Sequence, residues 1–133
     1  MISRKQFSLF FAFGLALAPQ CVNAQSTRFA LVCIGTETGY EVNFSARWGK
    51  SGRWSEESIR PGKWKIFTWN YDYPGEDRSP MLNIHYDDDL SEGSNFVTTA
   101  LPAYAASTKD CEAQGKTFNF YSRGDELYIQ EED

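Results

Sequence analysis

The sequence is poor in the residues that most enzymes use for catalysis or metal binding. It contains one histidine, His85, and three cysteines, none of them in a Cys-x-x-Cys pair. A structural zinc site takes about four nitrogen or sulfur ligands, so this supply does not favour one. His85 shares a strand face with Asp87, but no nucleophile completes a triad with them. We therefore predict no catalytic residues, no cofactor and no enzymatic activity.

Long hydrophobic runs are also absent, apart from one near the N-terminus. Phe7–Ala18 is mostly apolar over 12 residues, which is shorter than the ~20 residues needed to span a bilayer. Arg4 and Lys5 precede this run and Val22-Asn23-Ala24 follows it, as is typical of a secretory signal peptide. The sequence predicts cleavage after Ala24, export to the periplasm or the extracellular medium, and no membrane anchor.

The few cysteines predict one disulfide bond. Cys21 is the alternative site of lipidation, but the preceding Ala18-Pro19-Gln20 differs from a lipobox of the Leu-Ala-Gly type, and cleavage after Ala24 removes it. Cys33 and Cys111 then remain as an even pair in an oxidising compartment, where cysteines bond to each other. The closed loop would hold 79 residues, and closing it would stabilise the fold by at most ~4–5 kcal/mol, because strain in the folded state subtracts from the entropic gain. A two-cysteine metal site is the weaker alternative.

Positive charge is in short supply. Without Arg4 and Lys5, residues 25–133 carry 11 basic and 18 acidic side chains, which gives a net charge of −7. An acidic domain is not expected to bind nucleic acid or anionic membranes. These 109 residues are enough for one domain, so we predict a single domain over 25–133.

Helical periodicity is missing, whereas an alternation of apolar and polar residues recurs. In Tyr40–Trp48 the apolar and the polar side chains fall on opposite faces. Turn-forming pairs such as Pro61-Gly62 separate further segments. The sequence predicts an antiparallel β-sandwich, or alternatively a small β-barrel, of about seven or eight strands. We expect them near 28–34, 40–48, 53–59, 63–70, 80–87, 95–101, 116–122 and 125–131, with a connector over 101–116 that holds at most one helical turn.

All four tryptophans lie in Arg47–Trp69, together with six of the thirteen basic residues. Trp48 continues the apolar face of its strand, which predicts a place in the core. Trp54 has no apolar neighbour two positions away, which predicts that it forms a contact surface with Arg53 and Arg47. Arginine forms paired hydrogen bonds with carboxylate or phosphate, and it stacks on aromatic rings. The alternative is that these basic residues only protect strand edges from pairing.

The segment 63–70 has apolar side chains on both faces of its predicted strand. Trp64 and Ile66 share one face, and Phe67 and Trp69 share the other. This pattern predicts a central strand between two layers, with the connector as an alternative cover for one face.

The acidic run Asp87-Asp88-Asp89 is a weak candidate for a Ca²⁺ site. Alternating oxygen ligands follow it, but glycine falls at the seventh position and Thr98 at the twelfth. An EF-hand loop requires glycine at the sixth position and glutamate at the twelfth, so that motif does not match. We therefore assign no metal ligands.

These observations favour a secreted, non-catalytic binding module for an envelope, carbohydrate or protein partner. A secreted enzyme inhibitor or antagonist is the second hypothesis. A small hydrolase using carboxylates such as Glu56 and Glu57 is the third, because two carboxyl groups suffice for glycoside hydrolysis. Asn43-Phe44-Ser45 is in addition a formal N-glycosylation triplet.

Overall fold

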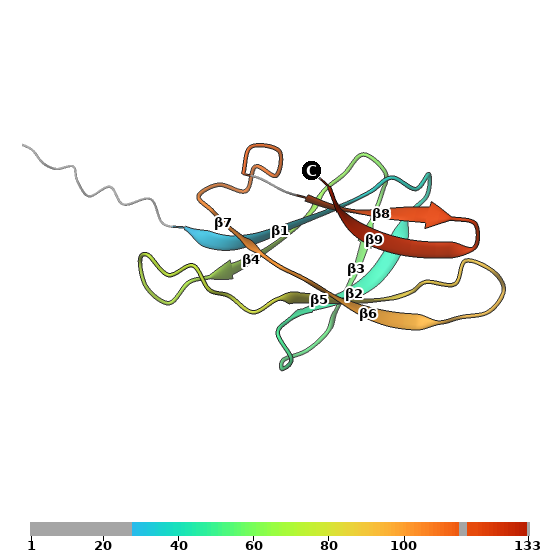
Figure 1. Ribbon diagram of the computed structural model, residues 1–133, viewed down its shortest axis with the longest axis horizontal. Helices are drawn as coiled ribbons and strands as arrows, with labels where there is room; N and C mark the ends of the chain where they lie inside the picture. The colour runs from blue at the N-terminus through green and yellow to red at the C-terminus, as the bar shows by residue number, and fades with distance from the viewer. Residues whose placement is uncertain (1–27, 115–116, 133) are drawn as a thin grey trace, which may run out of the picture.

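A computed structural model describes residues 28–114 and 117–132 of the protein (Figure 1). The predicted signal peptide, its cleavage site after Ala24 and Cys21 lie outside these residues. Within them no helix is long and apolar enough to cross a membrane. The strands are β1 (Phe29–Thr36), β2 (Val42–Trp48), β3 (Ser55–Ile59), β4 (Lys65–Asn70), β5 (Leu82–Asp87), β6 (Phe96–Leu101), β7 (Tyr104–Ala106), β8 (Thr117–Arg123) and β9 (Glu126–Glu132).

Two sheets pack face to face, which confirms the predicted β-sandwich. The five-stranded sheet has the order β4-β1-β8-β9, with β7 paired to β1, and the four-stranded sheet has the order β3-β2-β5-β6. In Figure 1 β1, β8 and β9 lie above β5 and β6. All strand pairs are antiparallel except β1 with β8. β1 therefore changes neighbours along its length, pairing with β7 near its start and with β8 near its end.

The core lies between the sheets and follows the alternation of the sequence. β5 alternates strictly between buried and half-buried residues, as a strand with one covered face does. The largest side chain that is fully buried is Phe120, whose ring lies 5.5 Å from that of Phe44 and 5.2 Å from that of Tyr86. The buried residues of this cluster are Val32, Ile34, Val42, Phe44, Ala46, Ile59, Leu82, Ile84, Tyr86, Leu101, Phe118, Phe120 and Leu127. Trp48 is half-buried and packs against them, so its predicted place in the core is only partly correct.

A second, smaller cluster lies on the other side of β1. The Cys33–Cys111 disulfide joins β1 to the connector after β7, with the two Cα atoms 6.0 Å apart, and confirms the predicted bond. Leu31 and Ala106 pack beside it. β1 is therefore buried on both faces, because the connector covers the face that points away from the main core.

The connector departs from its prediction in one respect. It contains β7, a strand of three residues whose sequence Tyr-Ala-Ala is too short to show alternation. The expected single turn is present after it: the Gln114 amide donates to the Asp110 carbonyl at 3.0 Å, and the Asp110 carboxylate accepts from the amides of Glu112 and Ala113.

The central position predicted for 63–70 is wrong, because β4 forms an edge of the five-stranded sheet. Phe67 packs against the core, as expected for one face. On the other face Ile66 is 40% exposed and Trp64 is 38% exposed. Trp64 lies over Gly35 of β1, where an added Cβ would come within 2.7 Å of the indole. The missing glycine side chain, not a covering layer, accommodates this tryptophan.

Candidate binding surface on the four-stranded sheet

The outer face of the four-stranded sheet brings three rings into one row. In the strand registers Ser45 of β2 is opposite His85 of β5, and Asp87 of β5 is opposite Phe96 of β6. The side chains of these three strands that point away from the core therefore lie side by side. Trp54 immediately precedes β3 on the same face. We call Trp54, His85 and Phe96 the aromatic strip.

The rings of the aromatic strip contact one another in sequence. The centroids of Trp54 and His85 are 5.7 Å apart, and those of His85 and Phe96 are 5.3 Å apart with an interplanar angle of 13°. A hydrogen bond of 2.9 Å between His85 Nδ1 and Thr98 Oγ1 fixes the imidazole. Phe96 is 61% exposed and Trp54 is 37% exposed. The strip is therefore a preformed apolar surface in contact with solvent.

Arg47 extends the strip at its Trp54 end. Its guanidinium carbon lies 4.5 Å from the indole centroid, which is a cation–π contact. Its Nε is buried and, within the described part of the chain, has no hydrogen-bond partner. An unpaired buried donor is rare in native structures and is often explained by a ligand or water.

The predicted contact residues are thus brought together in part. Trp54 and Arg47 are in contact, whereas Arg53 is exposed and is not the arginine that covers the indole. The sequence did not identify His85 and Phe96 as members of the surface. No local pattern marks them, because they join Trp54 only through the pairing of β2, β5 and β6.

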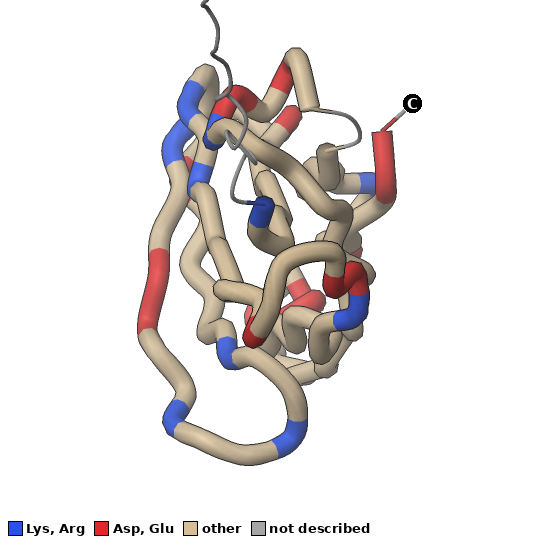
Figure 2. The backbone as a smooth tube through the Cα atoms, turned by 90° about the vertical axis from the view of Figure 1, so that its left-hand side faces the viewer, with Lys and Arg blue, Asp and Glu red and all other residues tan. Residues whose placement is uncertain are grey.

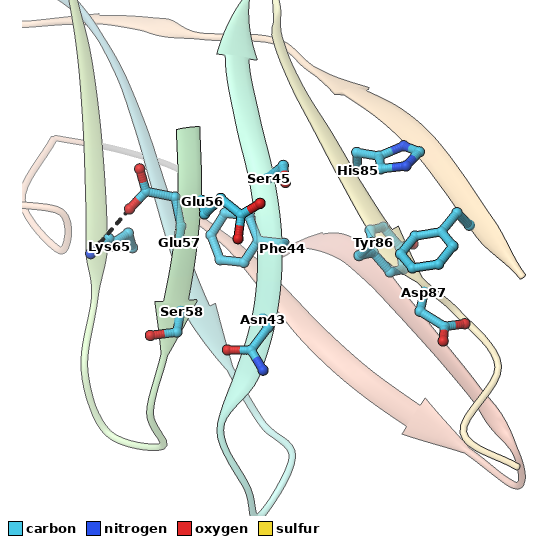
Figure 3. Close-up of a pocket in the computed structure, with 11 residues that line it drawn as sticks. Asn43, Phe44, Ser45, Glu56, Glu57, Ser58, Lys65, His85, Tyr86 and Asp87 are labelled. Carbon is cyan, nitrogen blue, oxygen red and sulfur yellow. Dashed lines mark ion pairs between the residues drawn. The ribbon is translucent and has the colours of Figure 1, made fainter. Parts of the chain in front are cut away.

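A groove of about 570 Å³ lies beside the strip (Figure 3). β2 and β5 pair only over Ser45–Trp48 and Leu82–His85, and the two strands part beyond this point. The core rings of Phe44 and Tyr86 line the groove there, and burial raises the pKa of the Tyr86 hydroxyl, with a hydrogen bond to Thr99 opposing the shift. The polar residues of the lining are Asn43, Ser45, Glu56, Glu57, Ser58, Lys65, His85 and Asp87, and Phe96 completes it.

The groove is acidic. Glu56, Glu57 and Asp87 line it together with Lys65. Lys65 Nζ is itself 3.2 Å from Glu57 Oε1, so its charge is already paired, as Figure 3 shows. The lining of the groove therefore carries a net negative charge.

Glu56 and Glu57 both line the groove, but they reach it from opposite faces of β3, because they are consecutive in this strand. Glu57 is opposite Phe44 in the register and turns toward Lys65 of β4, which links the edges of the two sheets. Two-carboxylate hydrolysis needs both groups beside the same bond, whereas the Glu57 carboxylate is paired with Lys65.

The carboxylates of Asp87, Asp88 and Asp89 hold the loop between β5 and β6. Asp87 Oδ1 accepts from the amides of Asp89 and Asn95, and Asp88 Oδ1 accepts from the Asn95 side chain. Hydrogen bonds from the Ser91 hydroxyl and amide lower the pKa of Asp89. Within 28–114 and 117–132 no three histidine, cysteine, aspartate or glutamate residues are grouped to hold a metal ion.

The basic residues do not form one patch. Lys50 and Arg53 lie before β3, and Arg60 and Lys63 lie after it, so the strand separates the two groups. Figure 2 shows basic segments at both ends of the molecule. The cationic composition of Arg47–Trp69 is therefore divided in space.

The outer face of the five-stranded sheet also has two stacked rings, but their polar groups are engaged. Tyr121 and Tyr128 are 5.6 Å apart at 24°. The Tyr121 hydroxyl donates to Glu132, and this hydrogen bond raises the pKa of Tyr121 to about 12. Arg123 lies 4.8 Å from the Tyr128 centroid. This face has the character of a packed polar network.

Comparison of the chain with models of protein families, with curated proteins and with solved structures finds no significant match.

Proposed function

We propose that the protein is a secreted binding module whose ligand is a neutral or amino-bearing glycan, held on the aromatic strip and in the adjacent groove. The observation that carries the proposal is the row Trp54–His85–Phe96, which keeps apolar rings in solvent on the surface of a folded domain. Exposed apolar side chains that gather on one face are typical of an interaction site.

The chemistry of sugars fits the surface. A pyranose ring has C–H groups on its faces, which pack on flat aromatic rings, and hydroxyl groups around its rim. The groove offers partners for such hydroxyls: the amide of Asn43, the hydroxyl of Ser45 and the carboxylates of Glu56 and Asp87. The same carboxylates disfavour phosphate- or uronate-rich ligands and attract an amino group.

Replacing Trp54 or Phe96 by alanine should raise the Kd for the glycan about tenfold or more. A tenfold change in Kd corresponds to a loss of ~1.4 kcal/mol of binding free energy. The matched control is Trp64→Ala, because Trp64 is 38% exposed but belongs to the other sheet, and this variant should keep the affinity of the unmodified protein. A glycan array with neutral, amino and uronic oligosaccharides finds the ligand, and titration calorimetry measures the affinities.

Absence of binding to any glycan class would contradict the proposal. An equal loss of affinity in Trp64→Ala and Trp54→Ala would contradict the assigned surface. If the unmodified protein captured a partner protein and the Phe96→Ala variant did not, the inhibitor or antagonist hypothesis would be favoured instead. Turnover of a polysaccharide, lost in Glu56→Gln, would favour a hydrolase.

Export belongs to the same proposal. The Cys33–Cys111 disulfide is compatible with a secreted or periplasmic protein, and the signal-like N-terminus supplies the route. Mass spectrometry of the protein recovered from its native host should find Gln25 at or near the N-terminus. Detection of an intact Met1, or of a diacylglyceryl group on Cys21, would refute cleavage after Ala24.

A further inference from the structure

β6 is an edge strand without the features that usually protect one. Its sequence, Phe-Val-Thr-Thr-Ala-Leu, has no charged residue and no proline before Pro102. Exposed strand edges invite pairing with another strand, and proteins normally block them with charges, prolines or short length. Phe96, at 61%, is also the most exposed of the large hydrophobic residues in the described part of the chain.

The free edge of β6 presents regularly spaced backbone groups. The Asp88 amide donates to the Asn95 carbonyl at 2.9 Å, so these residues form a hydrogen-bonded pair between β5 and β6. Because such pairs alternate along an antiparallel ladder, every second residue after Asn95 directs its backbone to β5. The backbone N–H and C=O groups of the residues between them point away from β5, namely those of Phe96, Thr98 and Ala100.

We infer that β6 pairs with β6 of a second copy of this chain. The two strands run antiparallel about a two-fold axis at Thr98, and the two four-stranded sheets become one sheet of eight strands. Around this axis Phe96 of one copy is opposite Ala100 of the other, and Thr98 is opposite itself. The outward backbone groups of all three residues are then paired across the axis.

The side chains of β6 suit this self-pairing. Phe96 is large and Ala100 is small, so the pair fills the surface without a clash. Two threonines opposite each other form a favourable cross-strand pair. No like charges meet, because the strand has none.

Two other edge strands of the described residues meet like charges when they pair with themselves about their middle residues. Antiparallel self-pairing of β3 about its middle residue sets Glu57 against itself. In β9 it sets Glu126 against Glu132. Like charges directly opposite each other destabilise a sheet.

The two remaining edges are obstructed or short. β4 begins at Lys65, which is tied across the edge to Glu57 of β3. β7 has only three residues, and its Tyr104 hydroxyl bonds to Glu131 of β9. β6 is therefore the edge at which a second copy fits.

The pairing also bears on the outer face. Phe96 ends the aromatic strip at the edge strand, so the strips of the two copies lie on one continuous face on either side of the two-fold axis. The inference does not rest on the proposed glycan binding, and failure of one leaves the other intact.

The test is the oligomeric state of the secreted protein in dilute and concentrated solution. Sedimentation velocity over a ~100-fold concentration range should show the mass rising from one chain toward two. Thr98→Lys places two ammonium groups on the axis and should leave a monomer throughout. The matched control is Ser58→Lys, which is also at an exposed position but lies on β3 at the other edge of the same sheet, and which should dimerise like the unmodified protein.

A crosslinking variant tests the register and does not depend on how Thr98→Lys folds. Residues of a hydrogen-bonded antiparallel pair have Cα atoms ~5.5 Å apart, within disulfide range. Thr98→Cys should therefore give a disulfide-linked dimer on mild oxidation, with the new bond between the two copies of position 98 in peptide mapping, whereas Ser58→Cys should not. A monomer at every concentration, or equal crosslinking of both variants, would overturn the inference.

Discussion

Replacing Cys33 and Cys111 together by alanine should lower the free energy of unfolding by about 4–5 kcal/mol in the chain-entropy account of disulfides. The bond closes a loop with a sequence separation of 78, so its loss frees much of the unfolded chain. This is a large share of the ~5–15 kcal/mol that stabilises a typical domain. Urea denaturation followed by tryptophan fluorescence measures the change.

Two further observations belong to this experiment. The dependence of the unfolding free energy on urea concentration should become steeper, because an unlinked chain exposes more surface when it unfolds. Treating the unmodified protein with a reducing agent should give the same loss as the double substitution. A loss below ~1 kcal/mol would contradict the chain-entropy account for this loop.

Phe120→Ala should destabilise the protein by ~3–5 kcal/mol, the range for removing a buried aromatic ring. Phe120 is completely buried. Its ring contacts the rings of Phe44 and Tyr86, which lie on the neighbouring strands β2 and β5 of the opposite sheet. Removing the ring would leave a cavity between the two sheets, where β8 would lose its contacts with β2 and β5. Thermal and urea unfolding give the change in stability.

Phe96→Ala is the matched control, because it removes the same side chain from a position that is 61% exposed. In dilute protein without ligand it should cost less than ~1 kcal/mol, as for exposed substitutions. Equal losses in the two variants would show that Phe96 has a stabilising role in the monomer, and would remove the basis for treating it as contact surface.

The strands that a local pattern could predict are those with one covered face. In β2 and β5 the alternation of side chains is the direct consequence of a core on one side and solvent on the other. The disulfide was predictable for a different reason: with Cys21 assigned to the predicted signal peptide, Cys33 and Cys111 were the one pair left to bond.

The position of a strand within its sheet was not predictable, because it depends on contacts between distant segments. The apolar residues of β4 indicated a central strand, yet β4 lies at an edge of its sheet. Trp64 packs on Gly35, and the ring centroids of Trp69 and Trp48 are 6.0 Å apart. The aromatic strip depends on the same long-range information. Trp54 and Arg47 were singled out from their neighbours in sequence, whereas Phe96 joins them only through the register of β5 and β6.

The exchange of neighbours along β1 has a kinetic consequence. β1 is the first described strand, and it needs β4, β7 and β8 to complete its pairing. Such long-range pairings fold slowly, since wide loops must close before any contact is gained. A growing chain that has reached only β6 would leave one side of apolar β1 open, and such surfaces aggregate. We therefore expect the protein to depend on a chaperone, or on delivery in an extended form, until the hairpin of β8 and β9 is available.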